Sequence, residues 1–418
     1  MAPRSPQLYE AIRRFCLGAF ACLYRESQAE APLPFSFEEH VAPDRPPLYE
    51  YRPLTRGYVE ARADRLLALD DAHYAVEELA REPAAAIFSR AHADASSPGG
   101  GERLFRSILL PLLSGIADQC GGFEWDDRVF ERAYLDLEQA LFGERHAYAA
   151  IAPLVGVSVP VPVSLGRGLR VRAAAVGEIS SYWPEANGLL PPAFGREAER
   201  AAVAELECVF PAGAVELPDA PGEIADAVTA LRLATAAPVA AGPVLFERLD
   251  WRPVGVRPVL AIAAAEPPGE PTRLDEFRGG LAAELLQRLA VCDGDPPLGE
   301  AVDHWELSLF AAEPSRSGEL RESLAALLGA GDGLWAASAR LAALVGESPA
   351  ERGELFARLR GLAGGGHAST RDGEAIRRAI VEALMSDDRH GLVARLDDSL
   401  LGLTPRPRSY FAVEALAS

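Results

Sequence analysis

The spacing of apolar residues changes twice along this chain, and the two changes constrain its fold more than any other feature. In roughly the first and last thirds of the 418 residues, apolar side chains recur every three or four positions, as one face of an α-helix requires. Between about residues 147 and 270, valine-rich runs alternate with prolines and glycines, a pattern typical of strands and turns. The chain is therefore predicted to be a helix-rich α+β protein. Its expected parts are an N-terminal helical region (1–146), a mixed α+β domain (147–270), a C-terminal helical bundle (271–404) and a tail (405–418).

Helix boundaries are well marked in the N-terminal region. Ser5 can cap a first helix, and Pro6 then occupies its first position. The proline-rich stretch 31–53 is predicted to be a loop. Further helices are expected over 58–94, 102–120 and 127–142, with Asp127 as the cap of the last one.

The middle region is expected to form a sheet with few helices. Residues 147–166 carry no charge and are long enough to cross a bilayer, but prolines interrupt them, so buried strands are the better interpretation. The segment Gly166-Arg167-Gly168 has two of the glycines of a dinucleotide-binding loop and lacks the third, which favours a tight turn between strands over a phosphate site. Strands are predicted over 155–163, 169–174, 203–210 and 254–263, with short helices near 178 and over 223–233.

The C-terminal region predicts successive short amphipathic helices joined by glycine-rich turns. Thr272 with Asp275, and Ser348 with Glu351, have the spacing of capping boxes. Leucines recur at helical spacing through 320–328, 334–344 and 355–362, and this succession predicts a helical bundle.

Two kinds of large side chain lie in apolar surroundings and are functional candidates. Trp305 and Trp335 lie among leucines at helical spacing and are expected to pack in the core or at a domain interface. Arg232 and Arg340 are flanked by apolar residues. Either arginine could pair with a buried carboxylate, but a packed stem with a solvated head is the commoner arrangement and is the one expected.

All 41 basic residues are arginine, so the chain contains no lysine. This excludes chemistry that needs a lysine side chain, including Schiff-base catalysis, attachment of pyridoxal phosphate and the phosphate contact of a P-loop. With 61 acidic residues the formal net charge is −20, which argues against general binding to nucleic acid or to anionic membranes. Only a local cleft lined by arginine would favour RNA.

The sequence contains no local catalytic or metal-binding motif. The seven histidines stand far apart, no C-x-x-C pair occurs, and the G-x-S-x-G motif of α/β hydrolases does not occur either. We therefore expect no metal and no cofactor. The five cysteines are scattered, which argues against a disulfide framework, and the first residues do not form a secretory signal. A cytoplasmic protein without membrane spans is expected.

Residues 301–386 resemble the C-terminal helical domain of the Apea-like HEPN family. The matching stretches are, in order, 305–310, 321–329, 334–347 and 355–362, with 168–172 and 230–233 similar to segments that precede such domains. The resemblance implies a helical bundle of a kind that often dimerises. In many members it is a metal-independent ribonuclease with an R-x(4–6)-H motif at the dimer cleft, where the histidine transfers protons and the arginine stabilises the phosphate.

Arg360 and His367 fit this motif, with six residues between them, and are the candidate catalytic pair. Other positions depart from the family pattern. Ala325 replaces the common glutamate of an Ala-Leu-Glu-Ala-Leu-Leu helix, and glycines at 364–366 replace the helix start that carries the motif arginine. Residues 297–404 contain 11 arginines against 17 acidic residues, which disfavours RNA.

These observations favour a non-catalytic HEPN-like binding or scaffold protein that self-associates, or binds a protein partner, through its C-terminal bundle. The alternative is a metal-independent HEPN-type ribonuclease using Arg360 and His367. A third hypothesis is an enzyme whose site is assembled from distant residues of the middle domain. The arrangement of these residues in space is what separates the three hypotheses.

Overall fold

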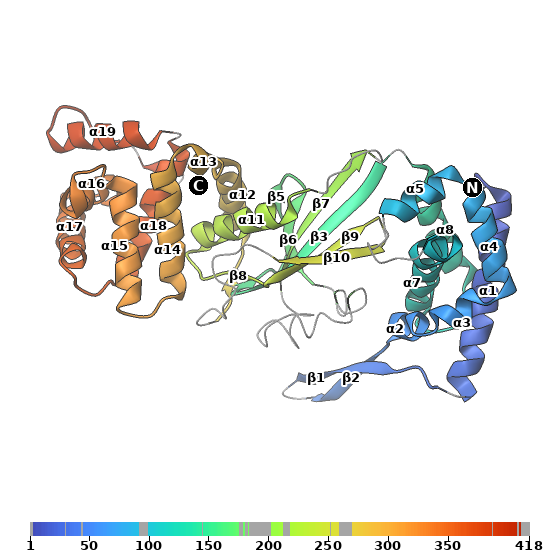
Figure 1. The fold of residues 1–418 in the computed structure, drawn as a ribbon. Helices are drawn as coiled ribbons and strands as arrows, with labels where there is room; N and C mark the ends of the chain where they lie inside the picture. The colour runs from blue at the N-terminus through green and yellow to red at the C-terminus, as the bar shows by residue number, and fades with distance from the viewer. Residues whose placement is uncertain are drawn as a thin grey trace.

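The computed structural model shows a helix-rich α+β fold (Figure 1). N-terminal helices lie on the right of the view, an antiparallel sheet with its helices lies in the middle, and a series of C-terminal helices lies on the left. The described residues are 3–29, 31–42, 45–91, 99–143, 145–174, 179, 183, 202–211, 218–250, 252–258, 270–386, 388–407 and 409–410.

The N-terminal helices pack around a hydrophobic core of their own. The first, α1 (Pro6–Ala29), begins at the predicted proline and buries Leu8, Ile12 and Phe15 on one face. Shorter helices than expected follow it, and residues 92–94 of the predicted long helix lie outside the described residues. The remaining elements are α2 (Thr55–Glu60), α3 (Ala63–Leu67), α4 (Asp70–Arg81), α5 (Pro83–Ala91), α6 (Gly101–Leu104), a π-helical stretch (Phe105–Leu109), α7 (Leu110–Cys120) and α8 (Asp127–Phe142).

Two helix boundaries in this region have simple causes. Pro83 cannot donate a backbone hydrogen bond within α4, so that helix ends at Arg81 and α5 begins at the proline. The cap of α8 is Asp126, whose side chain accepts a hydrogen bond from the N–H of Arg128. The cap predicted at Asp127 was therefore one residue too late.

The prediction of a loop over 31–53 is wrong. Residues Phe35–Ala42 (β1) and Arg45–Pro53 (β2) form an antiparallel hairpin that extends away from the helices (Figure 1). Proline is tolerated in this hairpin because both of its strands are edge strands, so half of their N–H groups need no partner. The proline content of the sequence concealed the strands.

The middle of the molecule is an antiparallel sheet, of which the described residues form seven strands. Its order is β10–β9–β3–β7–β6–β5, with the short β8 paired to β3. This confirms the buried-strand interpretation of the uncharged stretch, which contributes to β3, β4 and β5. The predicted helix near 178 and the predicted strand residues 259–263 lie outside the described residues. The strands are β3 (Arg145–Val155), β5 (Val163–Gly166), β6 (Leu169–Ala173), β7 (Ala202–Pro211), β8 (Ala240–Ala241), β9 (Val244–Leu249) and β10 (Arg252–Pro258), and a separate parallel pair joins β4 (Val157–Ser158) to β11 (Thr272–Arg273).

The Gly166-Arg167-Gly168 segment is the tight turn between β5 and β6, as expected. The φ angles of these residues are 88°, 52° and 80°, which all lie in the left-handed region. A Cβ atom on Gly168 would lie 2.0 Å from the carbonyl oxygen of Glu207, so only glycine fits at that position. The turn therefore explains both glycines.

Helices α11 (Ala220–Thr235) and α12 (Glu276–Arg288) cover one face of the sheet. Alternate residues of β3, such as Ala150 and Leu154, pack in one core with apolar residues of both helices. The helix predicted over 223–233 is confirmed as part of α11. The opposite face of the sheet has a small apolar cluster that includes Ile151, Val203 and Phe246.

The C-terminal part is a succession of short helices. The capping box at Ser348 and Glu351 is confirmed at the start of α17, with Pro349 in its first turn. The other predicted box is wrong, because Thr272 belongs to β11 and Asp275 alone caps α12. The helices are α13 (Val291–Gly294), α14 (Pro296–Phe310), α15 (Ser315–Leu328), α16 (Gly333–Val345), α17 (Pro349–Ala363), α18 (Thr370–Met385) and α19 (Arg389–Leu400).

The hydrophobic core of the sheet continues into the C-terminal helices. Trp305 on α14 is 1% exposed, as expected, and its indole N–H donates to the carbonyl of Gly373 on α18. Where α11 meets α14, Arg232 and Glu306 form an ion pair with 3.1 Å between Nη1 and Oε2. Burial raises the pKa of the Glu306 carboxyl, and the charge of Arg232 opposes this only in part. Arg232 thus pairs with a buried carboxylate, contrary to expectation.

Arg340 is also buried instead of extending to solvent, and it pairs with a partly exposed carboxylate. Its guanidinium forms a fork onto Asp397, at 2.7 Å from Nε to Oδ1 and 2.8 Å from Nη2 to Oδ2. Its Nη1 donates to the carbonyls of Leu328 and Gly329 at the end of α15. Arg389 donates to a neighbouring carbonyl of the same helix end. Guanidinium groups thereby donate to carbonyls at the helix end that receive no hydrogen bond from an N–H group of the helix.

Three smaller findings complete the fold. Across the part of the chain that the structure describes, no helix is both long and apolar enough to cross a bilayer. The five cysteines are free thiols, as expected. The tail returns to α12, where the hydroxyl of Tyr410 donates to Glu284 at 2.6 Å, while residues 411–418 lie outside the described residues.

Candidate functional site

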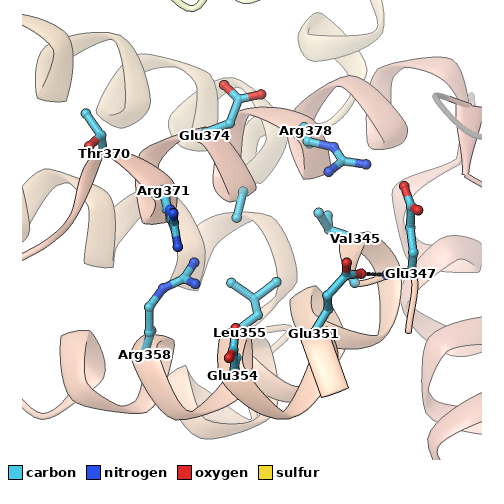
Figure 2. A pocket seen from close by; sticks show the side chains of 12 residues that line it. Val345, Glu347, Glu351, Glu354, Leu355, Arg358, Thr370, Arg371, Glu374 and Arg378 are labelled. Carbon is cyan, nitrogen blue, oxygen red and sulfur yellow. Dashed lines mark hydrogen bonds between the residues drawn. The ribbon is translucent and has the colours of Figure 1, made fainter. Parts of the chain in front are cut away.

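An open groove of about 620 Å³ lies between the end of α16 and helices α17 and α18 (Figure 2). Val345, Leu355 and Ala375 form its apolar floor and are themselves mostly buried. Its rim is charged with both signs. The charged residues are Glu347, Glu351, Glu354, Arg358, Arg371, Glu374 and Arg378.

The groove arises from one spacing repeated on two neighbouring helices. On α17, lining residues recur at i, i+3, i+4 and i+7 from Glu351 to Arg358, and on α18 the same spacing runs from Arg371 to Arg378. The two helices run in opposite directions and are joined by a turn that contains glycines 364–366. The end of the α17 face therefore lies opposite the start of the α18 face.

At one end of the groove, opposite charges face each other. The pKa of Glu351 is lowered, first by hydrogen bonds from the backbone N–H groups of Ser348 and Glu347 and further by the charge of Arg378. The two backbone bonds measure 3.1 Å and 3.0 Å at Oε2. Arg378 at this end therefore faces a carboxylate of the same chain.

At the other end, two arginines face each other. Figure 2 shows the guanidinium groups of Arg358 and Arg371 pointing toward one another across the groove. The Nε of Arg358 donates to Asp372 at 3.0 Å, and Asp372 also accepts from the N–H of Ser369. Arg371 is exposed and forms no hydrogen bond or ion pair with any residue that the structure describes. Like charges in this arrangement repel, and an anion between them would relieve the repulsion.

The nearby carboxylates do not neutralise Arg371. Glu374 is held by Arg377, with 2.8 Å between Oε2 and Nε and 2.6 Å between Oε1 and Nη2. Arg377 also donates to the carbonyl of Leu233 on α11, which fixes this pair against the sheet part of the molecule. Glu354 is exposed on the α17 side of the groove. The arginine end therefore presents one guanidinium, that of Arg371, with which no described carboxylate pairs.

The structure does not bring together the predicted pair Arg360 and His367. The guanidinium of Arg360 lies 5.8 Å from the ring centroid of Phe356. The His367 side chain is 78% exposed, and its Nδ1 lies 3.3 Å from Oε2 of Glu313. No hydrogen bond or ion pair joins Arg360 to His367, although both are described residues. Each therefore has a different neighbour, and neither lines the groove.

Trp335 is not in the core, contrary to prediction. It is 64% exposed, and its ring meets Phe356 edge-on with 5.7 Å between centroids. Trp335, Phe356 and Arg360 together are called the aromatic surface below. Tryptophan is one of the residue types enriched among those that contribute most to protein interfaces.

A second charged group lies on the sheet face opposite α11 and α12. Glu205 is fully buried, and its Oε2 accepts from the Nε atoms of Arg170 and Arg172, both at 2.6 Å. Arg248 approaches the other oxygen at 3.5 Å. Burial by itself would raise the pKa of Glu205, but the bonds from Arg172 and Arg170 outweigh it and lower the pKa. This cluster connects β6, β7 and β9 and has a structural explanation.

A third group has the residue types of a catalytic site. The Nδ1 of His146 lies 2.9 Å from Oδ2 of Asp250, and the hydroxyl of Tyr148 donates to Glu247. Asp250 has a φ of 56° and directly follows the end of β9. All four side chains are buried, which denies a substrate access to them. In the described part of the chain, no three His, Cys, Asp or Glu side chains are placed to hold a metal ion.

Arg358 and Arg371 were not singled out from the sequence, although a signal for them exists. Segments 351–358 and 371–378 share the pattern charged-x-x-Glu-apolar-x-x-Arg. Antiparallel packing of two such helices places the last residue of the first pattern beside the first residue of the second. The pattern therefore predicts facing arginines once the pairing of the helices is known.

Comparison with known proteins identifies no relative of this chain. No family model, no curated protein and no solved structure matches it. Its function is therefore argued from the groove and its surroundings.

Proposed function

We propose that this chain is a non-catalytic binding protein, whose C-terminal bundle takes a protein partner in the groove between α16, α17 and α18. The observation that carries this proposal is the groove itself, with an apolar floor under a rim of both charge signs. An apolar centre with a polar rim is the usual composition of a protein-binding site. A nucleic-acid site would instead need a rim that is mainly positive.

The resemblance of residues 301–386 to the Apea-like HEPN family supports the same proposal. That stretch covers α14 to α18, so the groove lies within the part of the chain that carries the resemblance. The bundle is proposed to be a degenerate HEPN-like domain that has the helices of the family and uses them for binding. A cytoplasmic location forms part of this proposal.

We further propose that the bundle self-associates through the aromatic surface. Tryptophan contributes strongly when it is buried at an interface, and Trp335 is largely exposed in the single chain. Size-exclusion chromatography with light scattering on the full chain should give the mass of a dimer, and Trp335→Ser should give a monomer. A wild-type monomer at every concentration would remove self-association and leave the groove proposal standing.

Selection of displayed random short peptides on the immobilised full chain tests the groove. Glu354→Trp fills the groove from its rim, and Ala375→Trp fills it from its floor. Glu322→Trp, on an exposed position of α15, is the matched control. Peptides should bind the wild type and the control but not the two filled variants. Peptides that bind all four proteins alike, or no selected peptides at all, would reject the proposal.

The alternative function, a ribonuclease using Arg360 and His367, has its own test. The separate neighbours of these two residues, Phe356 and Glu313, favour binding over catalysis. Total RNA is incubated with the purified protein and a metal chelator, beside His367→Ala. Cleavage that the variant loses would displace the binding proposal. Equal cleavage by both proteins, or none, would exclude this catalytic pair.

A further inference from the structure

We infer that the partner segment is an acidic and apolar peptide. One of its carboxylates lies between Arg358 and Arg371, and an adjacent apolar side chain lies on the floor at Leu355. This inference rests on the proposed function and adds the chemistry of the partner. It follows from the two arginines at one end of the groove and from the apolar floor beside them.

The arginine end has unused donors that suit a carboxylate. Asp372 takes only the Nε of Arg358, so both Nη groups of that arginine are left for a ligand. Arg371 contributes a second planar guanidinium that has no partner among the described residues. A carboxylate bound by two guanidinium forks makes charge-assisted hydrogen bonds in a geometry that a lysine could not supply.

The start of α18 adds to the attraction for an anion. Thr370 and Arg371 are the first two residues of this helix of 16 residues, and Ser369 caps only the third N–H, that of Asp372. The N–H groups of the first two residues have no acceptor within the helix, and the helix dipole is positive at this end. Both effects favour a negative group beside the arginine pair.

The rest of the groove sets the remaining chemistry of the peptide. The middle of the groove is apolar, and at the far end Arg378 lies near the carboxylates of Glu347 and Glu351. Glu347 and Glu354 add negative charge to the rim. A chain with a phosphate at every unit would be repelled there, whereas a peptide with one carboxylate beside an apolar residue would not.

The test uses the peptides selected on the wild-type full chain. The peptides that depend on the groove should be enriched in Asp or Glu next to Leu, Ile, Val or Phe. Calorimetry on the most enriched peptide should show affinity falling about tenfold or more in Arg371→Gln and in Arg358→Gln, as expected for loss of a charge-assisted hydrogen bond. Arg395→Gln, on the exposed side of α19 and outside the groove, is the control and should change affinity by no more than about twofold.

The other outcomes are separable. Groove-dependent peptides that lack acidic residues, or whose affinity does not respond to Arg371→Gln, would overturn the inference and leave the proposed function intact. Absence of groove-dependent peptides would remove both. A uridine-rich RNA oligonucleotide that displaces the peptides and itself needs Arg371 would assign the site to nucleic acid and overturn the inference.

Discussion

The buried pair of Arg232 and Glu306 makes a quantitative prediction about the junction between α11 and α14. The two side chains are 1% and 2% exposed, and their charges are 3.1 Å apart. Glu306→Gln keeps the shape of the side chain and leaves the guanidinium charge buried without its counter-charge. Breaking a buried pair in this way costs about 3–5 kcal/mol, which is roughly a hundredfold to several-thousandfold in the opening equilibrium.

Hydrogen exchange on the full chain, read by mass spectrometry, measures this loss locally. Peptides from α11 and α14 should exchange roughly a hundredfold or more faster in Glu306→Gln than in wild type. The increase cannot exceed the exchange rate that global unfolding allows. Peptides from α1 and α8 belong to a separate core and serve as the internal control. The double variant Arg232→Met with Glu306→Leu removes both charges and should recover most of the protection.

The same pair predicts a pH dependence in Arg232→Met. The pKa of Glu306 is raised in the folded chain. Its favourable contribution to the free energy of unfolding is therefore complete below the ordinary carboxyl pKa, and it is lost as pH rises through the pKa of the folded state. The charge of Arg232 lowers this pKa, so the pKa is higher still in the variant. The free energy of unfolding of the variant should therefore be closest to that of wild type near pH 5 and furthest from it near pH 8, as roughly expected for a raised carboxyl pKa. A pH-independent deficit, or a double variant as unstable as Glu306→Gln, would refute the reasoning.

Two further predictions concern other arginine contacts. Arg340→Lys cannot reproduce the fork onto Asp397, so it should lower the free energy of unfolding in urea by about 2–4 kcal/mol. The control Arg395→Lys, on the exposed side of α19, should change it by less than about 0.5 kcal/mol. Similar losses in both variants would contradict the role of the fork. The pKa of Glu205 is lowered, so its stabilising contribution is present at neutral pH and is lost as pH falls through its folded value. Urea midpoints measured down to about pH 3 should therefore show an acid loss in wild type that is smaller in Glu205→Gln, and equal losses would show that Glu205 is not its source.

The local patterns of the sequence predicted the elements whose causes are local. A capping residue, a first-turn proline and apolar spacing are enough to place α1, and the capping box at Ser348 is enough to place the start of α17. The alternation of valine-rich runs likewise indicated the sheet. Elements that depend on their tertiary context were missed. The hairpin over 35–53 is an example, because its strands tolerate proline only as edge strands, and the sequence does not show that they are edge strands.

The site residues show where sequence reasoning stops. Arg232 and Arg340 bind carboxylates that lie 74 and 57 positions away along the chain, and nothing near either arginine in sequence identifies those partners. Trp335 has the same helical setting as Trp305, yet it lies on the surface because none of the described helices covers it. The groove depends on α17 and α18 packing antiparallel, which is a tertiary property.

The most direct test of the proposed binding function is hydrogen exchange of the full chain with and without a peptide selected on it. The account predicts slower exchange in backbone segments within 345–378, which line the groove, and unchanged exchange in α1 and α8. Bound peptide that leaves the groove segments unprotected, or that protects another part of the chain instead, would contradict it.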